Sequence, residues 1–263
     1  MESTGGVYTF LSDGKEGVCG FYLISSPDEI IEIEFIDFEV DCESGGLVAV
    51  VDGWELNGNF FPSESDHHLS MKERYHTLCG KEVPKRIYLA SQNAALIQNY
   101  IPVPGEGFTV RVKYLPNPQP CNVLSMFQEG VYTMKNYGEK RNCSFSAIYP
   151  EKVRFLSIDV GSTGLNKERE LEFGVSDQCE SQKGGDDYVE ILGGNSFALS
   201  SLNRFKISCG LQSSADKHSE IVGCQHTVIR MVSSGQFYNT ITFLYTPPSN
   251  DEFAMADPNK CMN

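Results

Sequence analysis

The chain has 263 residues, of which 40% are hydrophobic and 21% are charged, and its formal net charge is −14. At this length we expect two globular domains, each with its own apolar core. Binding to nucleic acid depends on Lys and Arg side chains that replace the counterions of the phosphates, so an acidic chain is not expected to bind it. No stretch approaches the roughly 18–20 apolar residues of a membrane-spanning helix, so we expect a soluble protein with no membrane partner.

The nine cysteines indicate an oxidising compartment. In a reducing cytosol so many thiols would usually be metal ligands or catalytic groups, but the sequence has no C-x-x-C pair. The closest two, Cys209 and Cys224, are 15 residues apart, which suits disulfides between strands and not a zinc knuckle. We therefore predict a secreted, extracellular protein, although residues 1–10 lack the basic end and apolar run of a signal peptide.

Strand patterns dominate the first half of the chain. The segment 30–40 alternates between apolar and polar residues, but the phase changes between Phe35 and Ile36, which predicts a bulge. Further strands are predicted at 47–51 and at 108–115, where the alternation is that of a half-buried strand. The helix candidate is 70–78, because Ser70 and Glu73 have the spacing of a capping box.

Three alternate prolines at 116, 118 and 120 predict a stiff connector between two domains. Beyond it, strands are predicted at 153–160, 188–192, 227–232 and 241–245. Short strands separated by turn residues favour a β-sandwich or barrel. The expected organisation is a first domain at 1–116, incomplete at its amino terminus, a second domain at 117–246, and an irregular tail at 247–263 tied by a disulfide.

Similar short blocks occur in the same order in both halves, which predicts a repeated domain: CGF at 19–21 matches CSF at 143–145, and CES occurs at 42–44 and at 179–181. The number of cysteines alone allows many disulfide pairings, but the repeat reduces the number of pairings that need to be considered. Cys121 lies 22 residues before Cys143, and its counterpart in the first half would lie before Met1, so Cys19 is left unpaired. The missing signal peptide and this missing cysteine together predict truncation at the amino terminus. The pairs predicted from the repeat, with the last by elimination, are Cys42–Cys79, Cys121–Cys143, Cys179–Cys209 and Cys224–Cys261.

Motifs that carry catalysis are missing from the sequence. It has no G-x-S-x-G elbow, no H-E-x-x-H helix and no glycine-rich phosphate loop, and we expect no cofactor. His67, His68 and His76 lie close together in sequence, but no carboxylate or cysteine completes a metal-ligand spacing. Exposed positions in a loop and a short helix are the simpler interpretation. His218 and His226 are interpreted as loop residues.

Three other groups of residues each have a functional and a structural interpretation. The acidic run at 186–190 either offers oxygens to a calcium ion or is the solvated start of a strand. The matching residue in the first half is Gly46, which has no carboxylate, and this disfavours calcium there. Asn142 begins the sequence's N-x-S glycosylation motif, which is also common by chance. Trp54, Phe60 and Phe61 are candidate peptide-binding aromatics in a turn-rich stretch, although at least two of the three are expected to be buried.

Several blocks of residues resemble the corticotropin-releasing factor-binding protein family, whose two domains are similar to CUB domains. The blocks lie in both halves of the chain, and the two most specific ones, RNCSFS and VIRMVSSG, are not general CUB features. The blocks are VDGW at 51–54, ERY at 73–75, SQN at 91–93, PCNV at 120–123, RNCSFS at 141–146, IYP at 148–150 and VIRMVSSG at 228–235.

The resemblance implies an all-β fold of two tandem CUB-like jelly-roll sandwiches, mostly antiparallel. It implies a secreted glycoprotein of invertebrate type that sequesters corticotropin-releasing-factor-like or diuretic-hormone-like peptides without being an enzyme. An amphipathic peptide helix would lie in a groove of one or both sandwiches. The alternative is a general CUB interaction or protease-cofactor module bridged by calcium. Asp41 and Asp187 each match one place of a CUB calcium site, but Gly46 departs from that pattern, so no metal is expected.

Overall fold

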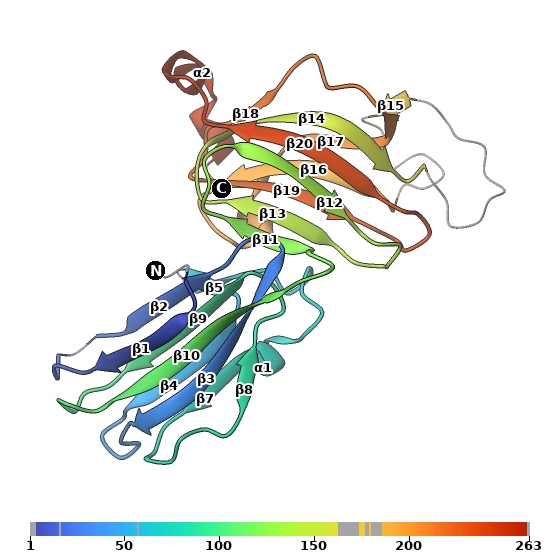
Figure 1. The fold of residues 1–263 in the computed structure, drawn as a ribbon. Coiled ribbons are helices and arrows are strands. Elements are labelled where there is room, and N and C mark those ends of the chain that lie inside the picture. The colour runs from blue at the N-terminus through green and yellow to red at the C-terminus, as the bar shows by residue number, and fades with distance from the viewer. Residues whose placement is uncertain are drawn as a thin grey trace. The chain divides into compact units, whose positions relative to one another are not determined.

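The computed structural model describes residues 4–15, 17–56, 58–162, 174–176, 179 and 186–261. The chain divides into two compact units (Figure 1). Unit 1 comprises residues 1–64 and 68–118, and unit 2 comprises residues 65–67 and 119–263. The boundary at 118 falls among the three alternate prolines. Within the described residues, no helix is long and apolar enough to cross a membrane.

The described part of unit 1 contains two four-stranded antiparallel sheets with an apolar core between them. The core includes Leu23, Ile31, Phe35, Val50 and Ile97. Sheet A has the order β2 (Cys19–Ile24), β9 (Ala94–Tyr100), β4 (Leu47–Asp52) and β7 (Tyr75–Leu78). Sheet B has the order β1 (Gly6–Leu11), β10 (Gly107–Pro116), β3 (Glu29–Glu39) and β8 (Ile87–Leu89). A hairpin of β5 (Trp54–Leu56) and β6 (Asn59–Phe61) forms a small separate sheet.

The change of apolar phase in β3 is a bulge, as the sequence predicts. Val110 pairs with Phe35 and Thr109 pairs with Asp37, so Ile36 is passed over in the ladder. Ile36 is exposed, whereas Phe35 and Phe38 on either side of it are buried. One inserted residue therefore keeps both halves of the strand facing the core.

The helix predicted at 70–78 is only one turn long. Its capping box is present: the Glu73 carboxylate accepts a hydrogen bond from the backbone N–H of Ser70 at 2.9 Å. The helix α1 (Met71–Arg74) ends where Tyr75 enters β7, which pairs with β4. The hydrogen bonds of sheet A thus replace the second helical turn, and the prediction is wrong over 75–78.

Unit 2 repeats this arrangement, with one strand shared between its two sheets. The strand β17 (Asn203–Gln212) pairs with β16 over most of its length and with β14 at its end. In the described part of unit 2, sheet C contains β11 (Asn122–Ser125), β13 (Cys143–Ala147), β19 (His226–Val232), β16 (Tyr188–Gly194) and the start of β17. Sheet D contains the end of β17, β14 (Glu151–Val160), β20 (Thr240–Thr246), β12 (Gly130–Lys135), β15 (Gly174–Ser176) and β18 (Glu220–Val222).

The strand registers turn the sequence repeat into a residue-by-residue alignment. Opposite β10, β3 skips one residue after Phe35, and opposite β20, β14 skips one residue after Phe155, so these two phenylalanines are equivalent. Counting back along both strands, Ile31 of unit 1 is equivalent to Glu151 of unit 2. In the neighbouring sheets the same comparison of β4 with β16 makes Gly46 equivalent to Asp187.

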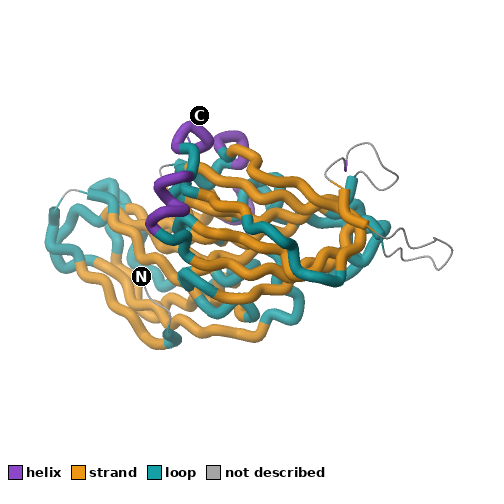
Figure 2. Tube along the Cα trace, turned by 90° about the horizontal axis from the view of Figure 1, so that it is seen from above, coloured by secondary structure: helices purple, strands orange, loops and turns teal. Residues whose placement is uncertain are grey.

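The described cysteines form four disulfides, and Cys19 is free and exposed. These are the pairs that the repeat predicts: Cys42–Cys79, Cys121–Cys143, Cys179–Cys209 and Cys224–Cys261. The tail at 247–263 is predicted to be irregular, but part of it is helical. It forms α2 (Asn250–Met255) and a 3-10 turn at Pro258–Cys261 (Figure 2). A second capping box, between Ser249 and Glu252, begins α2, and the disulfide to Cys224 holds the end of the tail.

Candidate functional site

The outer face of sheet A, which points away from the core of unit 1, is rich in tyrosine and bears no formal charge. Side chains alternate along strands, and Leu23, Val50 and Ile97 point into the core. The residues between them therefore point outwards. This outward set is Gly20, Tyr22, Leu47, Ala49, Val51, Tyr75, Thr77, Leu96, Gln98 and Tyr100.

The β5–β6 hairpin is fixed against β2 and β9 of this sheet. The indole N–H of Trp54 donates to the Leu23 carbonyl at 2.8 Å, and the Trp54 ring packs edge-on against Tyr22 at 5.1 Å between centroids. The Tyr22 hydroxyl donates to the Glu55 carbonyl at 3.1 Å, and the Gln98 amide donates to the Glu55 carboxylate. Burial and the nearby Glu55 charge raise the pKa of Tyr22, so its hydroxyl keeps its proton at neutral pH. The hairpin thus covers part of the outer face.

Two of the three aromatics predicted to contact a peptide are buried. Trp54 and Phe61 have exposed fractions of 6% and 4%, because they anchor the hairpin on the sheet. The burial of two of the three is as expected from the sequence, and it disfavours Trp54 and Phe61 as ligand contacts. Phe60 is half-buried and packs edge-on against Tyr75 at 6.4 Å. We define the aromatic face as Phe60 together with five outward residues of sheet A that keep accessible surface: Tyr22, Leu47, Tyr75, Gln98 and Tyr100.

The equivalent face of unit 2, on sheet C, is charged. Arg230 and Glu190 stand where unit 1 has Gln98 and Ala49, and their side chains form an ion pair at 2.9 Å. The segment Ser65–His67 belongs to unit 2, and Asp66 forms a second ion pair with Arg230 at 2.7 Å. Burial lowers the pKa of Arg230, but hydrogen bonds to Asp66 and Glu190 more than offset this and raise it above its usual value. The two units therefore share one fold, but the equivalent outer face is uncharged in unit 1 and charged in unit 2.

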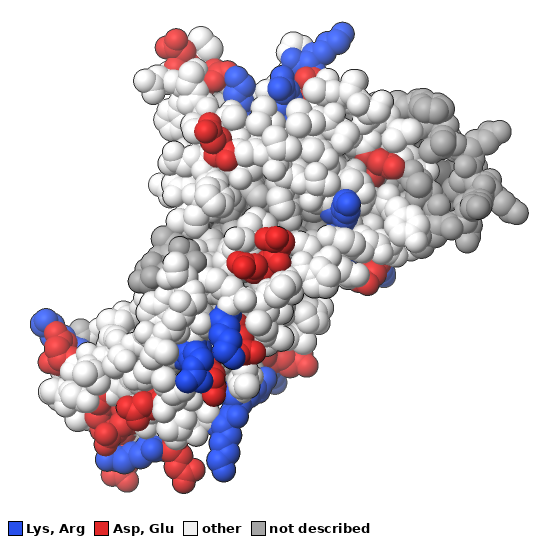
Figure 3. Space-filling model, in the orientation of Figure 1, with Lys and Arg blue, Asp and Glu red and all other residues white. Residues whose placement is uncertain are grey.

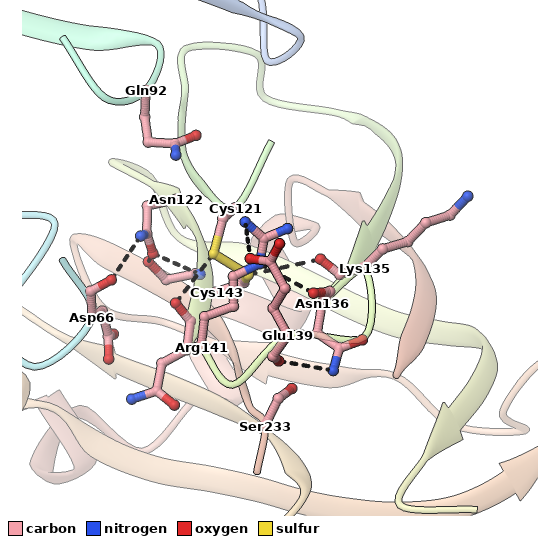
Figure 4. Close-up of a disulfide and its surroundings, with 12 residues drawn as sticks. Asp66, Gln92, Cys121, Asn122, Lys135, Asn136, Glu139, Arg141, Cys143 and Ser233 are labelled. Atoms are coloured by element: carbon pink, nitrogen blue, oxygen red, sulfur yellow. Dashed lines mark hydrogen bonds and ion pairs between the residues drawn. A yellow bond between two sulfur atoms is a disulfide. The ribbon is translucent and has the colours of Figure 1, made fainter. Parts of the chain in front are cut away.

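The disulfide Cys121–Cys143 lies beside a polar network around Asn122 (Figure 4). The Asn122 amide donates to the Asp66 carbonyl at 2.9 Å, and its oxygen accepts from the backbone and the hydroxyl of Ser144. Asn142, the predicted glycosylation residue, is half-exposed just before β13 and donates from its side chain to the Ser65 carbonyl at 3.3 Å.

The acidic residues considered for calcium do not converge. Asp187 is buried, and its carboxylate accepts from the backbone and hydroxyl of Ser234 and from the Asn239 amide at 2.6 Å. Neutral protein donors thus occupy both oxygens of this carboxylate. In unit 1 the Asp41 carboxylate accepts backbone N–H groups of its own turn. Among the described residues, no three His, Cys, Asp or Glu side chains gather as a metal site.

The histidines have separate structural settings. His67 belongs to unit 2, whereas His68 and His76 belong to unit 1. His76 packs against the Tyr88 ring at 5.6 Å, and burial lowers its pKa.

The interpretation of His226 as a loop residue is wrong, because this buried side chain begins β19. Its Nδ1 donates to the Ser196 carbonyl at 2.9 Å, so Nε2 accepts a hydrogen bond from Ser146. Burial lowers the pKa of His226 to about 4, and it is neutral at pH 7.

The described residues define a protein of two β-sandwich domains, each with at least one disulfide within it. The family model of the corticotropin-releasing factor binding protein N-terminal domain matches residues 1–116, and that of the C-terminal domain matches residues 123–254. The chain is 38% identical to the corticotropin-releasing factor-binding protein of Xenopus laevis over 93% of this chain and 74% of the relative. It is 37% identical to that of Homo sapiens over 93% and 73%. The chain therefore belongs to the corticotropin-releasing factor-binding protein family.

Solved structures with CUB domains also match. The CUB1-EGF-CUB2 region of human MASP-1/3 covers 92% of this chain and 99% of its own, at 12% identity and a TM-score of 0.31. The same region of rat MASP-1 covers 92% and 96%, at 12% identity and a TM-score of 0.30. The expectation of an all-β, mostly antiparallel fold is confirmed by the strands themselves, since the described pairs are antiparallel except β11 with β13.

Proposed function

We propose that this chain is a secreted binding protein for peptides of the corticotropin-releasing factor type and that it limits their signalling by sequestration, without acting as an enzyme. Its relatives are named for binding corticotropin-releasing factor, and the chain shares their family over nearly all of its length. The finer proposal is a diuretic-hormone-like peptide of an invertebrate. The observation that carries the proposal in this chain is the aromatic face of sheet A.

The aromatic face has the chemistry to bind the apolar side of an amphipathic helix. Tyr and Phe side chains supply large contact areas and lose few rotamers on binding, which is why they dominate the energy of many interfaces. Tyr22, Tyr75 and Tyr100 also carry hydroxyls that suit a half-polar interface. Glu55 lies beside this surface, where it would pair with a basic side chain of the peptide. The net charge of −14 would speed the encounter with a basic peptide at low salt.

Secretion is supported by the disulfides, which persist in oxidising compartments. Asn142 is proposed as a glycosylation residue, since its side chain is half-exposed. A glycan at this position would replace one amide hydrogen and leave the other to reach the Ser65 carbonyl. Peptide mapping of protein from a eukaryotic secretion system, before and after glycosidase treatment, tests this assignment.

Titration of the oxidised chain with a labelled corticotropin-releasing-factor-like peptide tests the function, and a matched pair of variants tests the surface. Leu47, on the aromatic face, and Leu89, on the outer face of sheet B, are 42% and 54% exposed. Leu47→Glu is expected to weaken binding about tenfold or more, because it places a charge in an apolar contact. Leu89→Glu is expected to leave binding unchanged.

The two possible failures have different meanings. If the unmodified chain binds no such peptide at micromolar concentration, the proposed function is wrong. If it binds, but Leu47→Glu binds as tightly as Leu89→Glu, the function stands and the aromatic face is not the site.

A further inference from the structure

A cavity of about 460 Å³ opens on the outer face of sheet D in unit 2, whereas the aromatic face belongs to unit 1. Its floor comes from β14, β18 and β20, where Arg154 pairs with Leu244 and Lys152 pairs with Ile221. Glu252 of α2 and residues 217–219, which precede β18, also line it. The cavity is thus built from four separate segments of one unit.

The charge of this cavity is opposite to that of the protein. Among the described residues, its lining includes Lys152, Arg154, Lys217 and His218, with Glu252 as the one acidic residue. With His218 counted as neutral, the lining has a net charge of +2, in a chain whose net charge is −14. Figure 3 shows Lys and Arg side chains, in blue, along this edge of unit 2 beside α2.

Most of these cations have no protein anion beside them. Lys152 forms an ion pair with Glu252 at 2.5 Å, and this hydrogen bond, with those from Ser249, lowers the pKa of Glu252 to about 2. Within the described residues, the side chains of Arg154, Lys217 and His218 have no ion-pair partner, and the buried Nε–H of Arg154 has no acceptor. A buried donor without an acceptor is costly, so the Arg154 guanidinium favours an oxygen acceptor beside it.

We propose that this cavity binds a sulfate or phosphate ester of a small organic molecule. The guanidinium fork of Arg154 matches the geometry of two oxyanion oxygens, and Lys217 supplies a point charge. Ser219 and Thr246 offer hydroxyl groups, while Ile221 and Leu244 give an apolar floor for the carbon part of the ligand. A long polyanion is disfavoured, because beyond the cavity it would meet a protein of net charge −14.

Calorimetric titration of the full oxidised chain with glucose 6-sulfate, glucose 6-phosphate and glucose tests the proposal. The two esters are expected to bind saturably and more weakly at high salt, whereas glucose is expected not to bind. Arg154→Gln is expected to weaken ester binding about tenfold, since it removes a charge-assisted hydrogen bond. The matched control is Lys135→Gln, because Lys135 is an exposed lysine on β12 that does not line the cavity, and it is expected to change nothing.

For a third variant, Glu252→Gln, we expect ester binding to become tighter and not weaker. Glu252→Gln removes the one acid of the cavity and frees Lys152, while glutamine still completes the capping box of α2. Ester binding is expected to tighten about threefold to tenfold, in line with the loss of a competing carboxylate at a partly exposed site.

Each outcome decides the proposal. Binding of one ester and not the other supports it and identifies the anion. The proposal is overturned if neither ester binds or glucose binds equally well. It is also overturned if Arg154→Gln, with an unchanged melting temperature, binds as the unmodified chain does, or if Glu252→Gln fails to tighten binding.

Discussion

Glu151 of β14 occupies the position in unit 2 that Ile31 of β3 occupies in unit 1. Both side chains are fully buried. Neither carboxyl oxygen of Glu151 has a hydrogen-bond partner among the described residues. The repeat has therefore placed an ionisable group where the fold requires an apolar one, and burial raises the pKa of Glu151 to about 8.

The raised pKa of Glu151 predicts that stability falls as pH rises. In the unfolded chain this carboxyl loses its proton near its usual value of 4.5, whereas the folded chain keeps the proton up to about pH 8. Between these values the unfolded state binds fewer protons, so each step up in pH favours unfolding, by a few kcal/mol in total. Glu151→Ile, which copies unit 1, is expected to raise the melting temperature at pH 8 by about 5 °C or more and to raise it less at pH 5.

The control for this prediction is Glu129→Gln, which changes an exposed carboxyl of the same unit. Calorimetric melting of both variants from pH 5 to pH 8 is the measurement. If Glu151→Ile and the unmodified chain keep a constant difference in melting temperature over this range, the pKa of Glu151 is not raised by burial.

The buried ion pairs of Arg230 predict a large cost for removing that side chain. Arg230→Ala would remove the cation from the almost fully buried carboxylate of Asp66 and leave the buried Glu190 carboxylate with Arg204. The free energy of unfolding of unit 2 is expected to fall by about 3–5 kcal/mol. Arg111→Ala, which breaks the more exposed pair with Glu34 in unit 1, is expected to cost about 1 kcal/mol or less. Urea denaturation compares the two, and equal costs would contradict the prediction.

Features set by local pattern could be predicted from the sequence. The strand expected at 108–115 is β10, and the phase change at Phe35 is the bulge of β3. Both depend on the alternation of apolar and polar side chains along one strand, and this alternation is visible in consecutive residues of the sequence. The repeat added long-range information, because two copies of one domain place equivalent cysteines at equivalent points.

Features set by tertiary contacts could not be predicted in this way. Residues 75–78 continue a helical pattern locally, but they pair with β4. Burial of at least two of the aromatics in the turn-rich stretch is expected from the sequence, but which two are buried depends on the hairpin folding back on sheet A, where Trp54 and Phe61 anchor it. The buried setting of His226 depends on its hydrogen bonds to Ser146 and Ser196, which are 80 and 30 residues away in sequence. In each case the residue that decides the environment is distant in sequence.

The Asp187 network predicts that calcium does not stabilise unit 2 through this carboxylate. Its oxygens already accept hydrogen bonds from Ser234 and Asn239. Addition of millimolar calcium after EDTA treatment is expected to leave the melting temperature unchanged, whereas Asp187→Ala is expected to cost about 1–3 kcal/mol, since it leaves buried donors unpaired. A calcium-dependent rise of several degrees that Asp187→Ala abolishes would instead support a calcium-bridged CUB module.

Cys19 and Cys143 are equivalent residues with different states, and this difference predicts their chemistry. Cys143 is bonded to Cys121, whereas Cys19 begins β2 as an exposed free thiol. Alkylation of the folded, unreduced chain is expected to label Cys19 alone. Cys19→Ser is expected to leave the free energy of unfolding unchanged, and Cys121→Ser is expected to lower it by about 2–5 kcal/mol, because it opens a 22-residue loop in the unfolded chain. Non-reducing peptide mapping that links Cys19 to any of the other eight cysteines would contradict both the pairing and the expected label.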